Sequence, residues 1–188
     1  MAAARSRWRR RQPGWDPERL VFIDETGLNT KMVRLYGRCP RELRCVDAVP
    51  HGHWQTSTFI AALRADGVTA PFLIEGAVNA EVFTAYLREV LCPELRAGDI
   101  VIRDNLSTHK IPAVAALVSA RRASVRYLPP YSPDLNPIEL AFAKLKSHLR
   151  LAAARTLEDL QGAVATSLGQ FRPAHCKGFF RHTHYGTI

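Results

Sequence analysis

The stretch from Tyr127 to Glu139 constrains the fold more than any other part of the chain. Its prolines are Pro129, Pro130, Pro133 and Pro137. Because proline lacks a backbone N–H and fixes φ, the stretch predicts a stiff loop that cannot join a sheet. Asn136-Pro137 is typical of a helix start, with Asn as N-cap and Pro at the first helical position. The sequence therefore places Glu139 in the first turn of a helix, behind a rigid lead-in.

Glu139 has two interpretations. Three residues after the N-cap, it occupies the position of a capping-box carboxylate, and an acid there suits the positive end of the helix dipole. It also qualifies as a functional carboxylate if other acids meet it. Nearby Asp134 is read as a turn-forming residue, whereas Tyr131 and Ser132 either contact a partner molecule or pack the loop.

Two aspartates end apolar runs upstream. Asp24 follows 20–23 and Asp104 follows 100–103, so both are expected at the carboxyl ends of strands, where active groups gather in α/β sheets. A charge there is costly unless a cation compensates it, and no basic residue has a spacing that would neutralise both. Oxygen ligands suit magnesium or manganese, and two such ions about 4 Å apart would serve phosphodiester chemistry.

The order of elements predicts an α/β fold with a mixed β-sheet flanked by α-helices. A turn is expected at Thr26-Gly27. The predicted strands cover residues 20–24, 31–36, 55–63, 68–74, 99–104 and 125–128. The predicted helices cover residues 80–91, 111–119, 137–153 and 157–171.

Composition narrows the class of partner. The chain has 188 residues and a net charge of +9, which favour one main domain and a polyanionic partner such as nucleic acid. No apolar run long enough for a membrane span occurs, and no secretion signal is visible. The cysteines are expected as free thiols. Two Cys/His groupings are candidate zinc sites, but their spacing matches no familiar ligand pattern: Cys39, Cys45, His51 and His53, and His175, Cys176, His182 and His184.

Three motifs together resemble the DDE transposases of bacterial insertion sequences in the mariner superfamily. They are Asp24-Glu-Thr-Gly27, Arg103-Asp-Asn-Leu-Ser-Thr-His-Lys110 and Pro129 to Glu139. The stretch 105–138, which separates Asp104 from Glu139, is 34 residues long. The resemblance covers roughly residues 18–172.

The resemblance implies a ribonuclease H-like fold with Asp24, Asp104 and Glu139 as catalytic, metal-holding acids. The implied cofactor is two Mg²⁺ or Mn²⁺ ions. The implied reaction is metal-dependent DNA cleavage at element ends, followed by transfer of the 3′-hydroxyl into target DNA at a TA dinucleotide. The implied setting is the bacterial cytoplasm at the nucleoid, with at least a homodimer in a synaptic complex.

Residues near the three acids are candidates for supporting roles. Glu25 is read as structural or as a supporting residue behind the metal ligands. Asn105 and His109 match the family's Asp-Asn-x-x-x-His pattern; they either orient ligands and touch phosphate or shape a turn. Excess basic residues favour DNA binding, with these candidates: Lys144, Lys146, Arg150 and Arg126.

The expected layout is a basic arm or linker remnant at 1–17, the catalytic domain at 18–172 and a basic tail at 173–188. Helix-turn-helix modules typical of the family are not seen, so a separately encoded N-terminal part or a truncated copy is expected. Two alternatives stay open: a nuclease of the same fold, and a non-catalytic fragment that binds DNA or full-length transposase and interferes with it.

Overall fold

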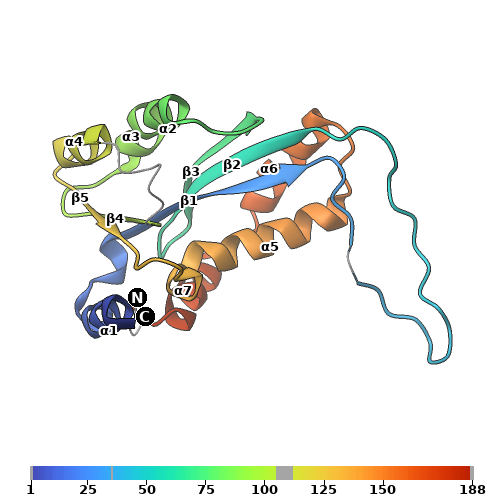
Figure 1. The fold of residues 1–188 in the computed structure, drawn as a ribbon, viewed down its shortest axis with the longest axis horizontal. Coiled ribbons are helices and arrows are strands. Elements are labelled where there is room, and N and C mark those ends of the chain that lie inside the picture. Colours follow the sequence, from blue (N-terminus) through green and yellow to red (C-terminus); the bar gives the residue numbers. More distant parts are fainter. Residues whose placement is uncertain (1, 35, 105–111, 187–188) are drawn as a thin grey trace.

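A five-stranded mixed sheet forms the centre of the fold (Figure 1). The computed structural model describes residues 2–34, 36–104 and 112–186. The sheet order is β3-β2-β1-β4-β5. The strands are β1 (Leu20–Asn29), β2 (Thr56–Leu63), β3 (Val68–Glu75), β4 (Ile100–Arg103) and β5 (Ser124–Tyr127). Hairpin neighbours β1–β2 and β2–β3 are antiparallel, whereas β1–β4 and β4–β5 are parallel. The predicted mixed sheet is confirmed.

Helices cover both faces of the sheet and enclose two hydrophobic cores (Figure 1). One face carries α1 (Ala2–Arg11), α5 (Pro137–Ala152), α6 (Leu157–Leu168) and α7 (Pro173–His182). The other carries α2 (Ala80–Tyr86), a π-helix (Leu87–Leu91), α3 (Cys92–Glu94) and α4 (Pro112–Ala120). Short 3-10 turns are η1 (Gln12–Gly14), η2 (Pro17–Arg19) and η5 (Pro133–Leu135). Strand alternation sends Phe22 to the α5 side and Ile23 to the α2 side.

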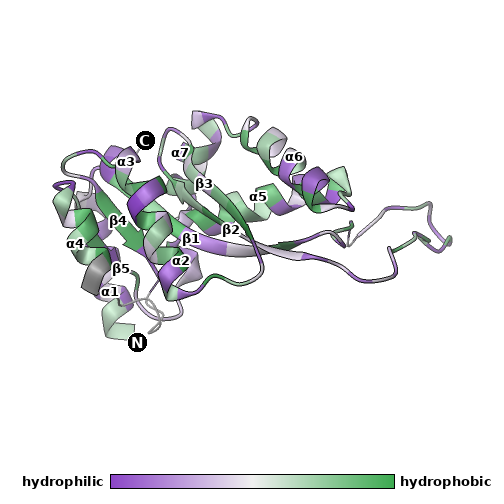
Figure 2. Cartoon of the chain, turned by 90° about the horizontal axis from the view of Figure 1, so that it is seen from above, coloured by the Kyte–Doolittle hydropathy of each residue, from purple (hydrophilic) through white to green (hydrophobic). Residues whose placement is uncertain are grey.

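Strand β1 is longer than its sequence suggested. The expected turn at Thr26-Gly27 is wrong, because β1 continues to Asn29. The described residues of the expected strand at 31–36 are not in a strand either. Its second half pairs with β2, with Gly27 opposite Thr58. This ladder supplies backbone hydrogen bonds that local propensity does not reveal. The connection from β1 to β2 extends far from the rest of the fold (Figures 1 and 2).

Both ends of the described chain pack into the fold, although the sequence suggested a basic arm at 1–17 and a basic tail at 173–188. Trp8 of α1 joins the same core cluster as Phe180 and Tyr185. Its Nε1 donates a hydrogen bond to Tyr185 Oη at 2.8 Å. Gln12, which is buried, donates to the carbonyl oxygen of Thr183 at 2.9 Å. A single tryptophan among arginines gives little periodic signal, and its burial depends on contact with the distant C-terminal segment.

Other predicted elements match within a few residues, but the predicted helix at 80–91 is interrupted by its π-helical turn. None of the helices in the described ranges is both long and apolar enough to cross a membrane. The cysteines are free thiols: Cys39 and Cys45 are exposed, whereas Cys92 and Cys176 are buried.

Candidate active site

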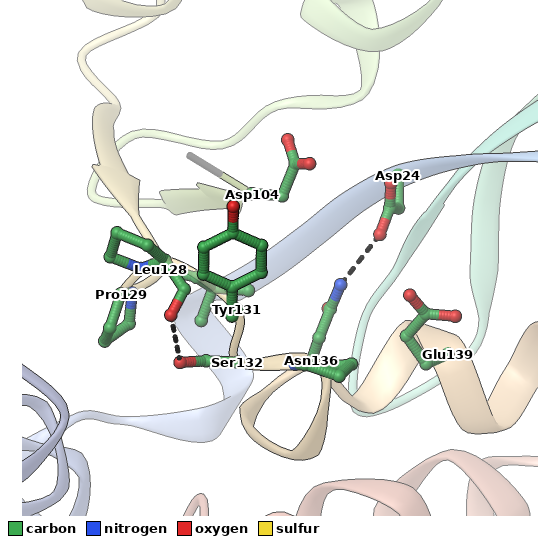
Figure 3. A pocket seen from close by; sticks show the side chains of 10 residues that line it. Asp24, Asp104, Leu128, Pro129, Tyr131, Ser132, Asn136 and Glu139 are labelled. Carbon is green, nitrogen blue, oxygen red and sulfur yellow. Dashed lines mark hydrogen bonds between the residues drawn. The ribbon is translucent and has the colours of Figure 1, made fainter. Parts of the chain in front are cut away.

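A pocket of about 440 Å³ lies where β1, β4 and α5 meet, and three carboxylates line it (Figure 3). Asp24 comes from β1, Asp104 follows β4, and Glu139 lies in the first turn of α5. The proline-rich loop forms the remaining wall, from Leu128 to Pro133. Acids that are distant in sequence therefore share one cavity.

The sheet register explains why the two aspartates meet. Strands β1 and β4 are parallel neighbours, with Leu20 opposite Ile100 and Phe22 opposite Ile102. The same register carried two residues further places Asp24 level with Asp104, just beyond the end of β4. Asp104 therefore follows the carboxyl end of β4, as predicted. The same prediction for Asp24 is wrong, because β1 continues past it to Asn29.

Asn136 has a different role from the one predicted. It occupies the N-cap position of α5, but its side chain makes no capping hydrogen bond. Instead, its Nδ2 donates to Asp24 Oδ2 at 2.8 Å (Figure 3). The prediction of side-chain capping by Asn136 is wrong, because a carboxylate from β1 accepts its amide. The sequence offered no signal for this long-range contact.

Asp24 lies in a strongly perturbed environment. Burial, together with the nearby carboxylates of Glu139 and Asp104, raises its pKa to about 7. Two hydrogen bonds oppose this shift: the Glu25 backbone N–H donates to Asp24 Oδ1 at 2.9 Å, and Asn136 donates to Oδ2. The pocket thus concentrates negative charge in a poorly hydrated place.

Arg103 lies behind this cluster, on the α2 side of the sheet. It is only 4% exposed, and its guanidinium carbon lies 4.4 Å from the centroid of the Phe83 ring. Burial lowers its pKa, while the charges of Asp104 and Asp24 oppose that shift. Asp24 nevertheless keeps a raised pKa, so Arg103 does not neutralise it. Because side chains alternate along a strand, Glu25 lies on the same face of the sheet as Arg103.

The carboxylates do not form a closed ligand set. Among the described residues, no three His, Cys, Asp or Glu side chains converge closely enough to hold a metal ion, and this includes both Cys/His groupings weighed above. Asn105 and His109 lie outside the described residues. The donor chemistry nevertheless fits a hard divalent cation, because carboxylate oxygens are its preferred ligands and a cation would relieve the repulsion at Asp24.

The predicted DNA-binding residues divide into two groups. Lys146 and Arg150 line a second pocket together. Lys144 instead contacts the α7 side, where its Nζ lies 2.7 Å from His175 Nδ1 and 4.9 Å from the Phe171 ring centroid. Arg126 is exposed on β5. The structure thus does not bring Lys144 and Arg126 to the pocket of Lys146.

Comparison with known proteins places these features in context. The sequence profile of the family described as DDE superfamily endonuclease matches residues 19–161. No curated protein sequence matches the chain.

Solved structures of similar fold include the Mos1 transposase paired-end complex with left transposon end, with TM-score 0.71 and 19% identity over 97% of this chain and 56% of that one. The catalytic domain of Mos1 mariner transposase gives TM-score 0.63 and 17% identity over 97% of this chain and 83% of that one. The likeness confirms the predicted ribonuclease H-like fold. The chain spans about 56% of the longer Mos1 chains. Because the family profile matches most of the length of this chain, the chain belongs to the DDE superfamily endonucleases.

Proposed function

We propose that this chain is the catalytic domain of a transposase that cleaves DNA at the ends of a mobile element and joins the freed 3′-hydroxyl to target DNA. The observation that carries the proposal is the meeting of Asp24, Asp104 and Glu139 in one pocket, from β1, β4 and the start of α5. Membership in the endonuclease family and the solved fold of Mos1 transposase support it.

In this proposal the three acids hold two divalent cations, Mg²⁺ or Mn²⁺, and are the catalytic residues. Related Mos1 structures were determined with these metals: a paired-end complex with Mn and a catalytic domain with Raltegravir and Mg. When bound, two such cations supply activation of the attacking oxygen and stabilisation of the leaving oxygen of the phosphodiester.

The protein residues have separate tasks. Asp24 presents an anionic oxygen whose orientation is set by the Asn136 amide and the Glu25 N–H. The rigid proline loop and the N-terminus of α5 hold Glu139 at the opposite wall. Arg103 supports Asp104 and Asp24 electrostatically from behind the sheet. Such buried support favours a preorganised site.

Finer features of the proposal follow from the sequence resemblance. We propose that the chain comes from a bacterial insertion sequence and that its target is a TA dinucleotide. The 34 residues of 105–138, between Asp104 and Glu139, correspond to the D-D-34-E pattern. We further propose the catalytic domain at 18–172, assembly as at least a dimer on DNA at the nucleoid, and recognition of element ends by a separately encoded helix-turn-helix part. Glu25, Asn105 and His109 are proposed supporting residues, and Lys146 and Arg150 proposed DNA contacts.

The test is nicking of supercoiled plasmid by the purified chain with Mg²⁺ or Mn²⁺. We expect Asp104→Asn to lose at least about 100-fold in nicking rate, because an acid that ligates catalytic metal is not replaceable by an amide. Glu158→Gln, which removes an exposed carboxylate on α6, is the matched control and should retain activity. Equal nicking by wild type and Asp104→Asn would refute the assignment.

A second assay separates the proposal from its alternatives. A pre-cut oligonucleotide with a free 3′-hydroxyl is offered together with a plasmid, and covalent joining is scored. Joining supports a transposase, whereas nicking without joining indicates a nuclease of this fold. DNA binding with neither reaction indicates the non-catalytic fragment.

A further inference from the structure

A second pocket of about 460 Å³ lies at the far ends of β1 and α5, where the long β1–β2 connection leaves the fold. We call it the Trp54 pocket. Its lining includes Gly27, Lys31, Val49, Trp54, Lys146 and Arg150. It combines cationic and aromatic side chains, unlike the acidic pocket at the start of α5.

Two cations of the Trp54 pocket, Lys146 and Arg150, lie close together on α5. Lys146 and Arg150 lie one helical turn apart on α5, and neither forms a salt bridge in the described parts of the chain. Burial lowers the pKa of Lys146, the neighbouring Arg150 lowers it further, and Glu139 opposes this shift. Like charges held together and partly desolvated favour an anion between them.

Trp54 adds an aromatic surface to this cationic pocket. The Lys31 ammonium lies 4.6 Å from the centroid of the Trp54 ring, so it covers one face of the ring. The side chain is nevertheless 53% exposed. A half-exposed indole beside cations is the arrangement with which proteins stack the bases of single-stranded nucleic acid.

The two pockets are linked along α5. Lys146 follows Glu139 by seven residues, which corresponds to two helical turns and a rise of about 10.5 Å on nearly the same helix face. Beyond Phe22, β1 pairs only with β2 among the strands that the structure describes. Gly27, which adds no side chain, lies in the wall of the Trp54 pocket. Helix α5 therefore connects the two pockets, with Glu139 in one and Lys146 and Arg150 in the other.

We propose that the Trp54 pocket binds an unpaired nucleotide of the DNA strand whose scissile phosphodiester lies at Asp24, Asp104 and Glu139. Lys146 and Arg150 bind its backbone phosphates, and its base stacks on Trp54. Stacking on an indole requires a free base face, which a nucleotide within an intact duplex does not offer. The inference rests on the proposed function and extends it: DNA at this site is locally unpaired.

The test measures binding in EDTA, so that no reaction occurs. A fluorescent oligothymidylate and a hairpin duplex of equal length are titrated with the full chain and its variants. We expect Trp54→Ala to weaken binding of the single strand about tenfold while duplex binding changes less than about twofold, and Trp54→Phe to restore most of the loss. Tyr36→Ala is the matched control, because Tyr36 is a 91% exposed aromatic of the same connection and does not line the pocket.

Arg150→Ala should weaken the binding of both ligands. It should also lower the slope of log affinity against log salt concentration by the amount expected for about one phosphate contact. Unchanged single-strand affinity in Trp54→Ala, equal losses for single strand and duplex, or no binding of the oligothymidylate by the wild-type chain would each overturn the proposal. Circular dichroism verifies that each variant is folded. The binding assay contains no metal, so its differences test the Trp54 pocket alone. Loss of nicking by Asp104→Asn in the separate assay with metal tests the proposed function alone.

Discussion

The side-chain amide of Asn136 donates a hydrogen bond to Oδ2 of Asp24 at 2.8 Å, although the two residues lie 112 positions apart. The contact joins the start of α5 to β1 at the acidic pocket. Asn136 is buried, and its hydrogen bond lowers the pKa of Asp24 against the larger effect of burial. It favours the ionised form of the acid and holds its Oδ2 in place.

Replacement of Asn136 by alanine should impair metal use more than folding. Without its donor, the pKa of Asp24 rises further and its carboxylate loses orientation, so we expect the Mn²⁺ concentration needed for half-maximal nicking to rise roughly tenfold. The pH at which nicking begins should shift upward. Thr156→Ala is the control, since it removes the N-cap of α6, where Thr156 Oγ1 accepts from Asp159 N at 3.0 Å. Equal metal and pH dependence in Asn136→Ala and wild type would contradict the positioning role.

Asp24→Asn should stabilise the metal-free protein above neutral pH. The folded pKa of Asp24, about 7, exceeds the ordinary value of 3.8, so its contribution to stability is present at low pH and is lost as pH rises from about 4 to about 7. The amide cannot ionise and avoids this loss. We expect a gain of roughly 1–2 kcal/mol at pH 8 in EDTA, less than the full pKa difference implies because the side chain keeps some contact with water. Urea denaturation at pH 4.5 and pH 8 measures it; an equal difference at both pH values would refute the electrostatic origin.

Arg5 of α1 should hold the proline-rich wall of the acidic pocket. It donates to Asp134 Oδ1 and Oδ2 at 2.9 and 2.6 Å and to Ser132 Oγ at 2.8 Å. We expect Arg5→Ala to speed chymotrypsin cleavage after Tyr131, which is 87% exposed, about two- to fivefold through easier local opening. Arg5→Asp combined with Asp134→Arg should restore resistance, and failure of that double variant would contradict the ion-pair explanation.

The same ion pair predicts a pH dependence. The hydrogen bond from Arg5 lowers the pKa of Asp134 below its ordinary value of 3.8. The folded pKa is therefore below the unfolded one, so the contribution to stability is present above about pH 4 and is lost as pH falls through the folded pKa. Protection of the Tyr131 site should decline over that acidic range in wild type and change little in Arg5→Ala. An acid-stable protease such as pepsin measures this.

Tyr185→Phe should destabilise the whole fold. The Tyr185 hydroxyl accepts from Trp8 Nε1 and donates to the carbonyl oxygen of Leu135, both at 2.8 Å, so it joins α1, the C-terminal segment and η5. Phenylalanine leaves both buried partners without their hydrogen bond, which should cost about 1–3 kcal/mol. Urea denaturation measures the change, with the exposed Tyr36→Phe as control. Equal stability of the two variants would contradict this central role.

Local chemistry explains which features were predictable. The apolar runs before Asp24 and Asp104 are short and end in polar residues, so both strands are visible in neighbouring residues, although the end of β1 at Asn29 is not. Pro137 marks the start of α5 because its fixed φ is compatible with the first helical turn. The order and spacing of the three acids were therefore readable, and the structure places them in one pocket.

Other features depend on partners that are distant in sequence. The length of β1 is set by its ladder with β2, the burial of Trp8 by Phe180 and Tyr185, and the role of Arg103 by the face of the sheet it occupies. Periodicity reports that a side chain is buried but not what it is buried against.

The sequence by itself determined the class of fold, the three acids and the rigid approach to Glu139, because propensity, proline geometry and hydrophobic pattern act between neighbours. Only the tertiary structure decided that Asn136 bonds to Asp24 and that Trp54 shares a pocket with Lys146 and Arg150. A hydrogen bond or a shared cavity requires atoms within a few ångströms, and for residues this far apart that proximity exists only once the sheet has formed.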